Sequence, residues 1–117
     1  MPATISPSTF RYFASQMFGT STNISEATQE RRYRAYFGTS PTTTSTVWYR
    51  LHKADLLPQN GLPKHLLWAQ LFLKTYASEE VHAGIAGVNE KTFRTFSWLF
   101  IEATTRLESQ IVSVNIL

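Results

Sequence analysis

Residues 78–96 read SEEVHAGIAGVNEKTFRTF, and this stretch predicts two short helices separated by Gly87. Ser78 is suited to cap the first helix, because a serine hydroxyl accepts a backbone N–H at a helix start. Asn89 is suited in the same way to cap the second helix, which opens at Glu90. Glycine most readily adopts the positive φ that is found just past a helix end. The stretch therefore predicts a helix, a tight turn and a second helix.

Residues within this stretch also meet the packing demands of a helix-turn-helix unit. Ala83 is small enough for the second helix to cross over it, and Phe93 supplies an apolar side chain that packs back under the first helix. Further apolar residues are expected to support this contact: Val81, Ile85, Val88 and Phe96. We therefore expect a helix-turn-helix at residues 78–100.

A helix-turn-helix that binds DNA presents its second helix to the major groove. Helical hairpins with a glycine turn also occur in proteins that do not bind DNA, so two interpretations remain open. One is DNA binding, and the other is a helical protein–protein interaction or oligomerisation module. If the second helix contacts DNA, the candidates are residues at its start and along its outer face: Asn89, Glu90, Lys91, Thr92, Arg94 and Thr95.

Length and composition narrow the class of protein. A chain of 117 residues fits one domain with a modest core, and a hydrophobic content of 43% is sufficient for a packed globule. There is no cysteine, which excludes disulfides and thiolate metal sites. The first residues, MPATISPSTF, lack the basic start and apolar stretch of a secretory signal. Polar residues interrupt the longest apolar runs, so we expect no membrane span.

The positive charge is concentrated in the first half of the chain. Residues up to Gly61 carry the whole net charge of +3, and the remainder is neutral. Three arginines, Arg31, Arg32 and Arg34, lie in the predicted helix EATQERRYRAYF. Such a cluster is typical of phosphate contact, and equally of a solvated helix face on which Glu30 neutralises part of the charge. Both interpretations remain open.

Capping patterns and apolar periodicity predict an all-α fold, an irregular bundle of about six helices. Helices are expected to start after the caps Ser6, Ser25 and Ser40, at Pro63, and at the two starts within residues 78–96. The segment KHLLWAQLFLKTY is apolar nearly all round and is expected to be a buried central pillar. The last helix is expected to end near Glu108.

These elements suggest three parts of the chain. Residues 1–24 would form an N-terminal helix and connector, with a loose end up to Ile5. Residues 25–110 would form the helical domain. Residues 111–117 are β-prone and would form a tail.

Several separated segments resemble a known family. The segments RRYRAYFGTSP, VWYRL and HLLWAQLFLKTYASEEVHAGIAGVNEKTFRTFSWLFIEA are similar to the N-terminal helical region of Harbinger-type transposases and endonucleases of the DDE superfamily. The resemblance covers roughly Arg31 to Leu107. It implies a helix-turn-helix region that binds double-stranded DNA in the nucleus, with Lys91, Thr92 and Arg94 on the recognition helix. The family often has a second basic residue and a tryptophan after KTFR, where this chain has Thr95 and Phe96.

The catalytic part of that family is not expected in this chain. A DDE nuclease uses three carboxylates to hold two metal ions, and the chain has a single aspartate, Asp55. His52, His65 and His82 are too dispersed for a metal site and are expected at the surface or the core edge. Neither a nucleophile elbow nor a glycine-rich phosphate loop is present.

We therefore expect a chain that is not an enzyme and needs no cofactor or metal. Its expected partners are double-stranded DNA and, as a further possibility, a second copy or another protein. The three tryptophans lie among apolar residues at helical spacing and are expected in the core: Trp48, Trp68 and Trp98.

Overall fold

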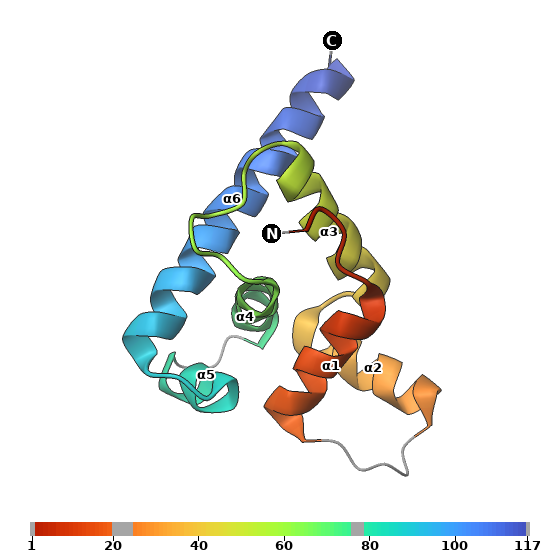
Figure 1. The fold of residues 1–117 in the computed structure, drawn as a ribbon, viewed down its shortest axis with the longest axis vertical. Helices are drawn as coiled ribbons and strands as arrows, with labels where there is room; N and C mark the ends of the chain where they lie inside the picture. Colours follow the sequence, from red (N-terminus) through yellow and green to blue (C-terminus); the bar gives the residue numbers. More distant parts are fainter. Residues whose placement is uncertain (1, 20–24, 76–78, 117) are drawn as a thin grey trace.

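The computed structural model describes residues 2–19, 25–75 and 79–116. All regular structure within these residues is helical, which confirms the expected all-α fold. Figure 1 shows the helices packed in an irregular bundle from which the end of α6 projects. The six helices are α1 (Pro7–Phe18), α2 (Glu26–Phe37), α3 (Pro41–Lys53), α4 (Pro63–Thr75), α5 (Glu79–Ala86) and α6 (Glu90–Ile116).

The first three helices start at the serine caps that the sequence predicts. The hydroxyls of Ser6, Ser25 and Ser40 each accept the backbone N–H three residues further on, at distances of 3.1 to 3.3 Å. At the other end of α2, the N–H of Gly38 donates to the carbonyl of Arg34 at 2.9 Å. These helix ends follow from local sequence, because the capping bonds join residues only a few positions apart.

The extended segment before α1 is held against α3, so the expectation of a loose N-terminal end is wrong for residues 2–5. The indole Nε1–H of Trp48 donates to the carbonyl of Pro2 at 3.1 Å. The hydroxyl of Ser45 donates to the carbonyl of Ile5. Both bonds span more than 35 positions of sequence, so no local pattern could reveal them.

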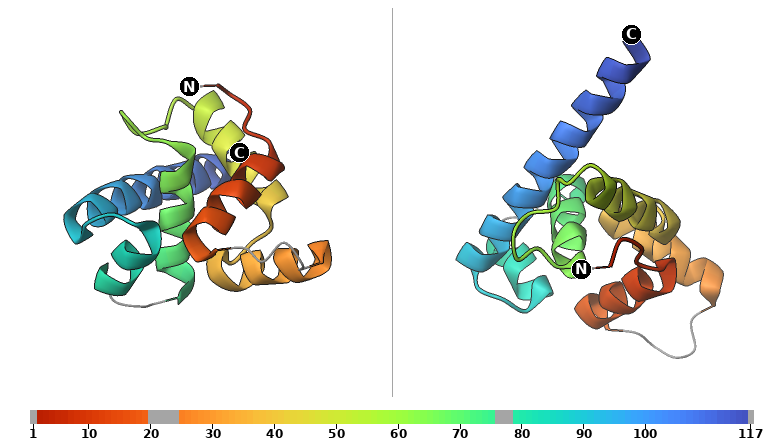
Figure 2. Two further views of the ribbon diagram at one scale, coloured as in Figure 1. Left: turned by 60° about the horizontal axis from the view of Figure 1, so that its bottom comes forward. Right: turned by 45° about the horizontal axis from the view of Figure 1, so that its top comes forward.

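Helix α4 is the central helix, as its apolar sequence predicts. It packs against α2 and α6 and also contacts α1, α3 and α5. The right-hand view in Figure 2 shows α4 between α6 on one side and α1 and α3 on the other. The main core gathers around it and includes residues of α1, α2, α3 and α6: Phe10, Ala14, Tyr33, Phe37, Trp48, Leu51, Leu66, Leu67, Ala69, Leu71, Phe100, Ala103 and Leu107.

A buried polar chain joins three of these helices. The hydroxyl of Tyr33 donates to Thr44 at 2.8 Å, and Thr44 lies 3.0 Å from the side-chain oxygen of Gln70. Thr44 is fully buried, and burial raises the pKa of Tyr33 above its ordinary value. Threonines are weak helix formers, so the start of α3 needs other support. The Tyr33–Thr44 hydrogen bond and the Ser40 cap help to provide it.

Three expectations for α5 and α6 are wrong. Helix α6 does not end near Glu108 but continues to Ile116, so most of the segment expected as a β-prone tail is helical. Trp98 is 52% exposed rather than in the core, whereas Trp48 and Trp68 are buried as expected. Val81 is 53% exposed and does not join the helix-turn-helix core. The expected cap Ser78 lies outside the described residues.

Candidate nucleic-acid interface

The turn between α5 and α6 has the geometry that the sequence predicts. Gly87 takes a positive φ of 75°. The N–H of Val88 donates to the carbonyl of Ala83 at 3.0 Å, and the N–H of Gly87 donates to that of Gly84 at 3.3 Å. This pair of bonds is the Schellman motif, which satisfies the last carbonyls of a helix and reverses the chain direction. The turn therefore ends α5 and sets the start of α6.

Asn89 fixes the first turn of α6. Its side-chain oxygen accepts the N–H of Thr92 at 2.8 Å, and its carbonyl accepts the N–H of Phe93 at 3.1 Å. This is the expected N-cap, and it confirms that α6 opens at Glu90. The oxygen of the Asn89 amide is used in the cap, so its NH₂ group is the part that can donate to a ligand.

Helices α5 and α6 pack through the residues that the helix-turn-helix pattern assigns to the contact. Ala83 is 3% exposed and Phe93 is fully buried. Together with Trp68 of α4 they form a second apolar cluster. The rings of Trp68 and Phe93 are stacked with centroids 5.7 Å apart. The partly buried residues around this cluster include Val88 and Phe96, as expected.

Two buried histidines support the inner side of α6, although the sequence predicted surface or core-edge positions for them. His65 is 4% exposed, and its ring stacks on Phe96 with centroids 3.9 Å apart. His82 is fully buried, and its ring lies 5.5 Å from that of Phe93. Burial lowers the pKa of His82, so its neutral form is favoured.

Hydrogen bonds determine which ring nitrogen of each histidine carries the proton. The N–H of Leu62 donates to Nδ1 of His65 at 2.9 Å, so this nitrogen is unprotonated. His65 thereby takes the place of the glutamate in a capping box at the start of α4. Thr75 donates its hydroxyl to the carbonyl of Leu71 at 2.8 Å, so Nε2 of His82 donates to Thr75. The Nδ1 atom of His82 is buried and has no hydrogen-bond partner among the residues that the structure describes.

The opposite side of α6 carries the residues expected to contact DNA. Lys91, Arg94 and Thr95 are exposed on neighbouring turns, and Asn89 and Glu90 are exposed at the helix start. Thr92 is half-buried, and its backbone N–H is already used in the cap. The hydroxyl of Thr95 donates to the carbonyl of Lys91 at 2.9 Å, which leaves its oxygen as an acceptor.

A shallow depression lies beside this helix start, where the chain leaves α5. Its lining includes the exposed Gly84, which has no side chain to fill it. A strand of nucleic acid could therefore approach the turn closely. The residues that line the depression are Ala83, Gly84, Val88, Asn89, Glu90 and Lys91.

Along the exposed face of α6, the basic side chains at its start are followed by an aromatic one. Trp98 follows Lys91 and Arg94 at helical spacing, and its ring lies 5.7 Å from that of Phe72 on α4. Leu73 of α4 is also 51% exposed. The sequence does not reveal this exposed apolar patch, because a tryptophan among apolar neighbours is typical of a core position.

The arginines of α2 form a surface that is separate from the start of α6. Arg31, Arg32 and Arg34 are all exposed, and α1 and α4 lie between α2 and the start of α6 in Figures 1 and 2. Glu30 pairs with Arg11 of α1 at 2.7 Å, so its charge is shared with another helix. The side chain of Lys74, which no local pattern places there, runs beside Gly38 at the end of α2.

Comparison of the chain with known protein families, curated proteins and solved structures gives no match. None of the helices in the described ranges combines the length and apolar character that a bilayer span requires. Within the same ranges, no three histidine or carboxylate side chains gather in an arrangement that could hold a metal ion.

Replacing Gly87 with alanine tests the turn. The added methyl group meets nothing within 4 Å, so the cost comes from the positive φ and should be about 1 kcal/mol of unfolding free energy. The matched variant is Gly84→Ala, which also has open space but lies inside α5. It should stabilise the protein by up to about 1 kcal/mol. Urea unfolding of both variants measures the difference, and a G87A protein as stable as G84A would contradict the assigned turn.

Stability should fall on acidification because of His65. Burial and the nearby charge of Lys64 lower its pKa from 6.5 to about 4. A histidine with a lower pKa in the folded state contributes its full stability above pH 6.5 and loses it as the pH falls toward about 4. The loss should be on the order of 3 kcal/mol, with a further contribution in the same direction from His82.

Urea midpoints between pH 7 and pH 4 measure this loss. In His65→Gln the amide oxygen can accept the Leu62 N–H without titrating, so the dependence on pH should become shallower. His52→Gln, which removes a half-exposed histidine of α3, controls for the loss of a histidine. The assignment fails if H65Q and the parent protein have the same slope.

Proposed function

We propose that this chain is a DNA-binding module in which α6 enters the major groove of double-stranded DNA with its first two turns. The observation that carries the proposal is the combination of the Schellman turn, the Asn89 cap and the outward Lys91 and Arg94. A helix-turn-helix uses this arrangement to fix the second helix at an angle to the first, with its N-terminal residues toward the bases.

The resemblance to the N-terminal region of Harbinger-type transposases supports the same proposal. On this proposal the chain is non-catalytic, derives from a transposase and acts in the nucleus. Its role is to recognise a site on DNA rather than to cut it.

Each outward residue has a chemistry that suits one part of the duplex. Lys91 and Arg94 can neutralise phosphates or bind guanine, and the amide NH₂ of Asn89 can donate to either. Glu90 can accept a hydrogen bond from cytosine. The hydroxyl oxygen of Thr95 can accept a bond from a base or a bridging water, while Thr92 contributes through the cap rather than through an exposed side chain.

The arginines of α2 would contact different phosphates from those reached by α6, because two helices separate the surfaces. Arg31, Arg32 and Arg34 are exposed and can bind the backbone without regard to sequence. Lys74 would add to that surface. Contacts of this kind strengthen binding to any duplex and make it sensitive to salt.

The test is binding to a labelled mixed-sequence duplex of about 20 base pairs, measured by anisotropy at several salt concentrations. We expect a dissociation constant on the order of 1 to 100 µM, as for non-specific binding. Lys91→Ala combined with Arg94→Ala should weaken it at least tenfold and reduce the salt slope by about two.

The control variant carries the same change of charge elsewhere. Arg50 and Lys53 are exposed on α3, and replacing both with alanine removes two positive charges away from the first two turns of α6. This variant should bind DNA nearly as well as the parent. If the two double variants lose affinity equally, only the net charge matters and α6 is not the contact.

A second candidate function is a protein-interaction or oligomerisation module, and the exposed Trp98 favours it. Tryptophan is enriched at the centres of protein interfaces, and this one is 52% exposed beside Phe72. The patch continues the same face of α6 that carries Lys91 and Arg94. A chain that pairs through it could also bind two DNA half-sites.

Light scattering after size-exclusion chromatography tests this candidate. If the patch is a self-interface, the parent chain should be a dimer at micromolar concentration, and Trp98→Ala should weaken the dimer by about 30-fold, the effect of losing a typical hot spot. Tyr12→Ala removes an equally exposed aromatic from α1 and should leave the dimer intact. A parent chain that is monomeric at all concentrations would rule out this self-interface.

A further inference from the structure

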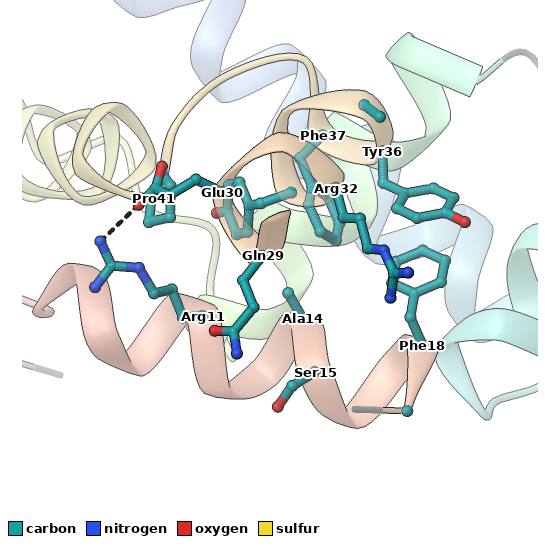
Figure 3. Close-up of a pocket in the computed structure, with 13 residues that line it drawn as sticks. Arg11, Ala14, Ser15, Phe18, Gln29, Glu30, Arg32, Tyr36, Phe37 and Pro41 are labelled. Carbon is teal, nitrogen blue, oxygen red and sulfur yellow. Dashed lines mark hydrogen bonds and ion pairs between the residues drawn. The ribbon is translucent and has the colours of Figure 1, made fainter. Parts of the chain in front are cut away.

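A cavity lies between α1 and α2, away from the face of α6 that we propose for DNA. Its volume is about 400 Å³, within the range of sites that hold small organic molecules. Figure 3 shows side chains of both helices directed toward it. Its lining includes apolar and aromatic groups together with a few charged ones, among them Arg11, Phe18, Glu30, Arg32, Tyr36 and Phe37.

Aromatic rings form one wall of this cavity. Phe18 of α1 and Tyr36 of α2 are stacked with their centroids 3.8 Å apart. The ring of Phe37 meets that of Phe18 edge-on at 5.9 Å. Tyr36 remains 38% exposed although it belongs to this stack. The wall therefore offers a flat aromatic surface on which a planar ligand can lie.

Most of the polar groups around the cavity already have partners. Arg11 donates to Glu30 at 2.7 Å, so their charges offset each other. The hydroxyl of Tyr33 donates to Thr44, and that of Ser15 donates to the carbonyl of Tyr12. Within the described part of the chain, Arg32 makes no hydrogen bond or ion pair, and its side chain extends on the same side as Phe18 and Tyr36 in Figure 3.

We propose that this cavity binds a small aromatic anion, a planar apolar molecule that carries one carboxylate or sulfonate. The rings of Phe18 and Tyr36 would contact its aromatic body, and the guanidinium of Arg32 would pair with its negative charge. Among the described residues, the net charge of the lining is positive because Arg32 is the one lining cation that no carboxylate offsets. An arginine fork suits a carboxylate or sulfonate because it presents parallel N–H donors.

The character of the lining separates this site from the proposed DNA interface. A DNA backbone requires several cations on an exposed face, whereas this cavity has one available cation and an apolar wall. Ligand binding in the cavity does not depend on DNA binding by α6, although Arg32 also belongs to the arginines proposed to contact phosphates. Tyr36→Ala should therefore weaken ligand binding and leave DNA binding unchanged, and Lys91→Ala combined with Arg94→Ala should do the reverse, which would show that the two activities are independent.

The experiment uses anilinonaphthalene sulfonate as the probe, because it combines an aromatic body with one negative charge and fluoresces when bound. We expect the parent protein to bind it with a dissociation constant on the order of 10 to 100 µM. Arg32→Gln should weaken binding about tenfold. Arg31→Gln, which removes the same charge from the neighbouring position outside the cavity, should leave it unchanged.

A neutral probe separates the aromatic contribution from the charge. Phenylnaphthylamine has the same ring system without the sulfonate, so R32Q should bind it as well as the parent does. Tyr36→Ala should weaken binding of both probes, and Tyr12→Ala, an exposed aromatic outside the cavity, should weaken neither. Circular dichroism confirms that each variant is folded.

Three results would overturn the proposal. They are no saturable binding by the parent at high micromolar probe, equal losses in R32Q and R31Q, and equal losses in Y36A and Y12A. The second result would show general attraction of an anion to a basic helix, and the third would show non-specific adsorption to exposed rings.

Discussion

The burial of most of α4 is the constraint on which the rest of the structure depends. A helix that is apolar nearly all round loses stability wherever it meets water, so other helices must cover most of its surface. Helix α2 covers one side, α6 covers another, and α1, α3 and α5 add further contacts, while Leu73 stays exposed near its end. Leu66, Leu67 and Leu71 are almost completely buried as a result. The long α6 is held along this pillar, and its outward face is set by the contacts on its inward face.

That coupling links the core to the proposed function. Phe93 and Phe96 pack toward Trp68 and His65 of α4, which rotates Lys91 and Arg94 toward solvent on the opposite side. The Schellman turn and the Asn89 cap then fix where α6 begins. A recognition helix needs such rigid support, because base contacts require side chains held in one position. Two neutral, buried histidines are part of the support, so protons and DNA affinity would be linked through the stability of this region.

The distribution of charge and aromatic surface divides the molecule into regions with different chemistry. The start of α6 is modestly basic, and further along the same face Trp98 joins Phe72 in an exposed apolar patch. The arginines of α2 form a second basic region across α1 and α4. Between α1 and α2, Arg32 and the stacked Phe18 and Tyr36 line a cavity of small-molecule size. The net charge of +3 therefore does not describe how the charged and aromatic side chains are distributed over the surface.

The sequence by itself determined the helices, their serine and asparagine caps, the turn at Gly87 and the central place of α4, because these depend on bonds between residues a few positions apart or on the polarity of one helix. It could not determine that Trp98 is exposed, that His65 and His82 are buried, or that Pro2 and Ile5 are held by α3, since each depends on residues distant in the chain. The same holds for the separation of the α2 arginines from α6. Helix propensity also misjudged the region after Glu108, where α6 continues through β-branched residues to Ile116. The tertiary structure decided these points because burial is a property of the whole packing arrangement and not of any single segment.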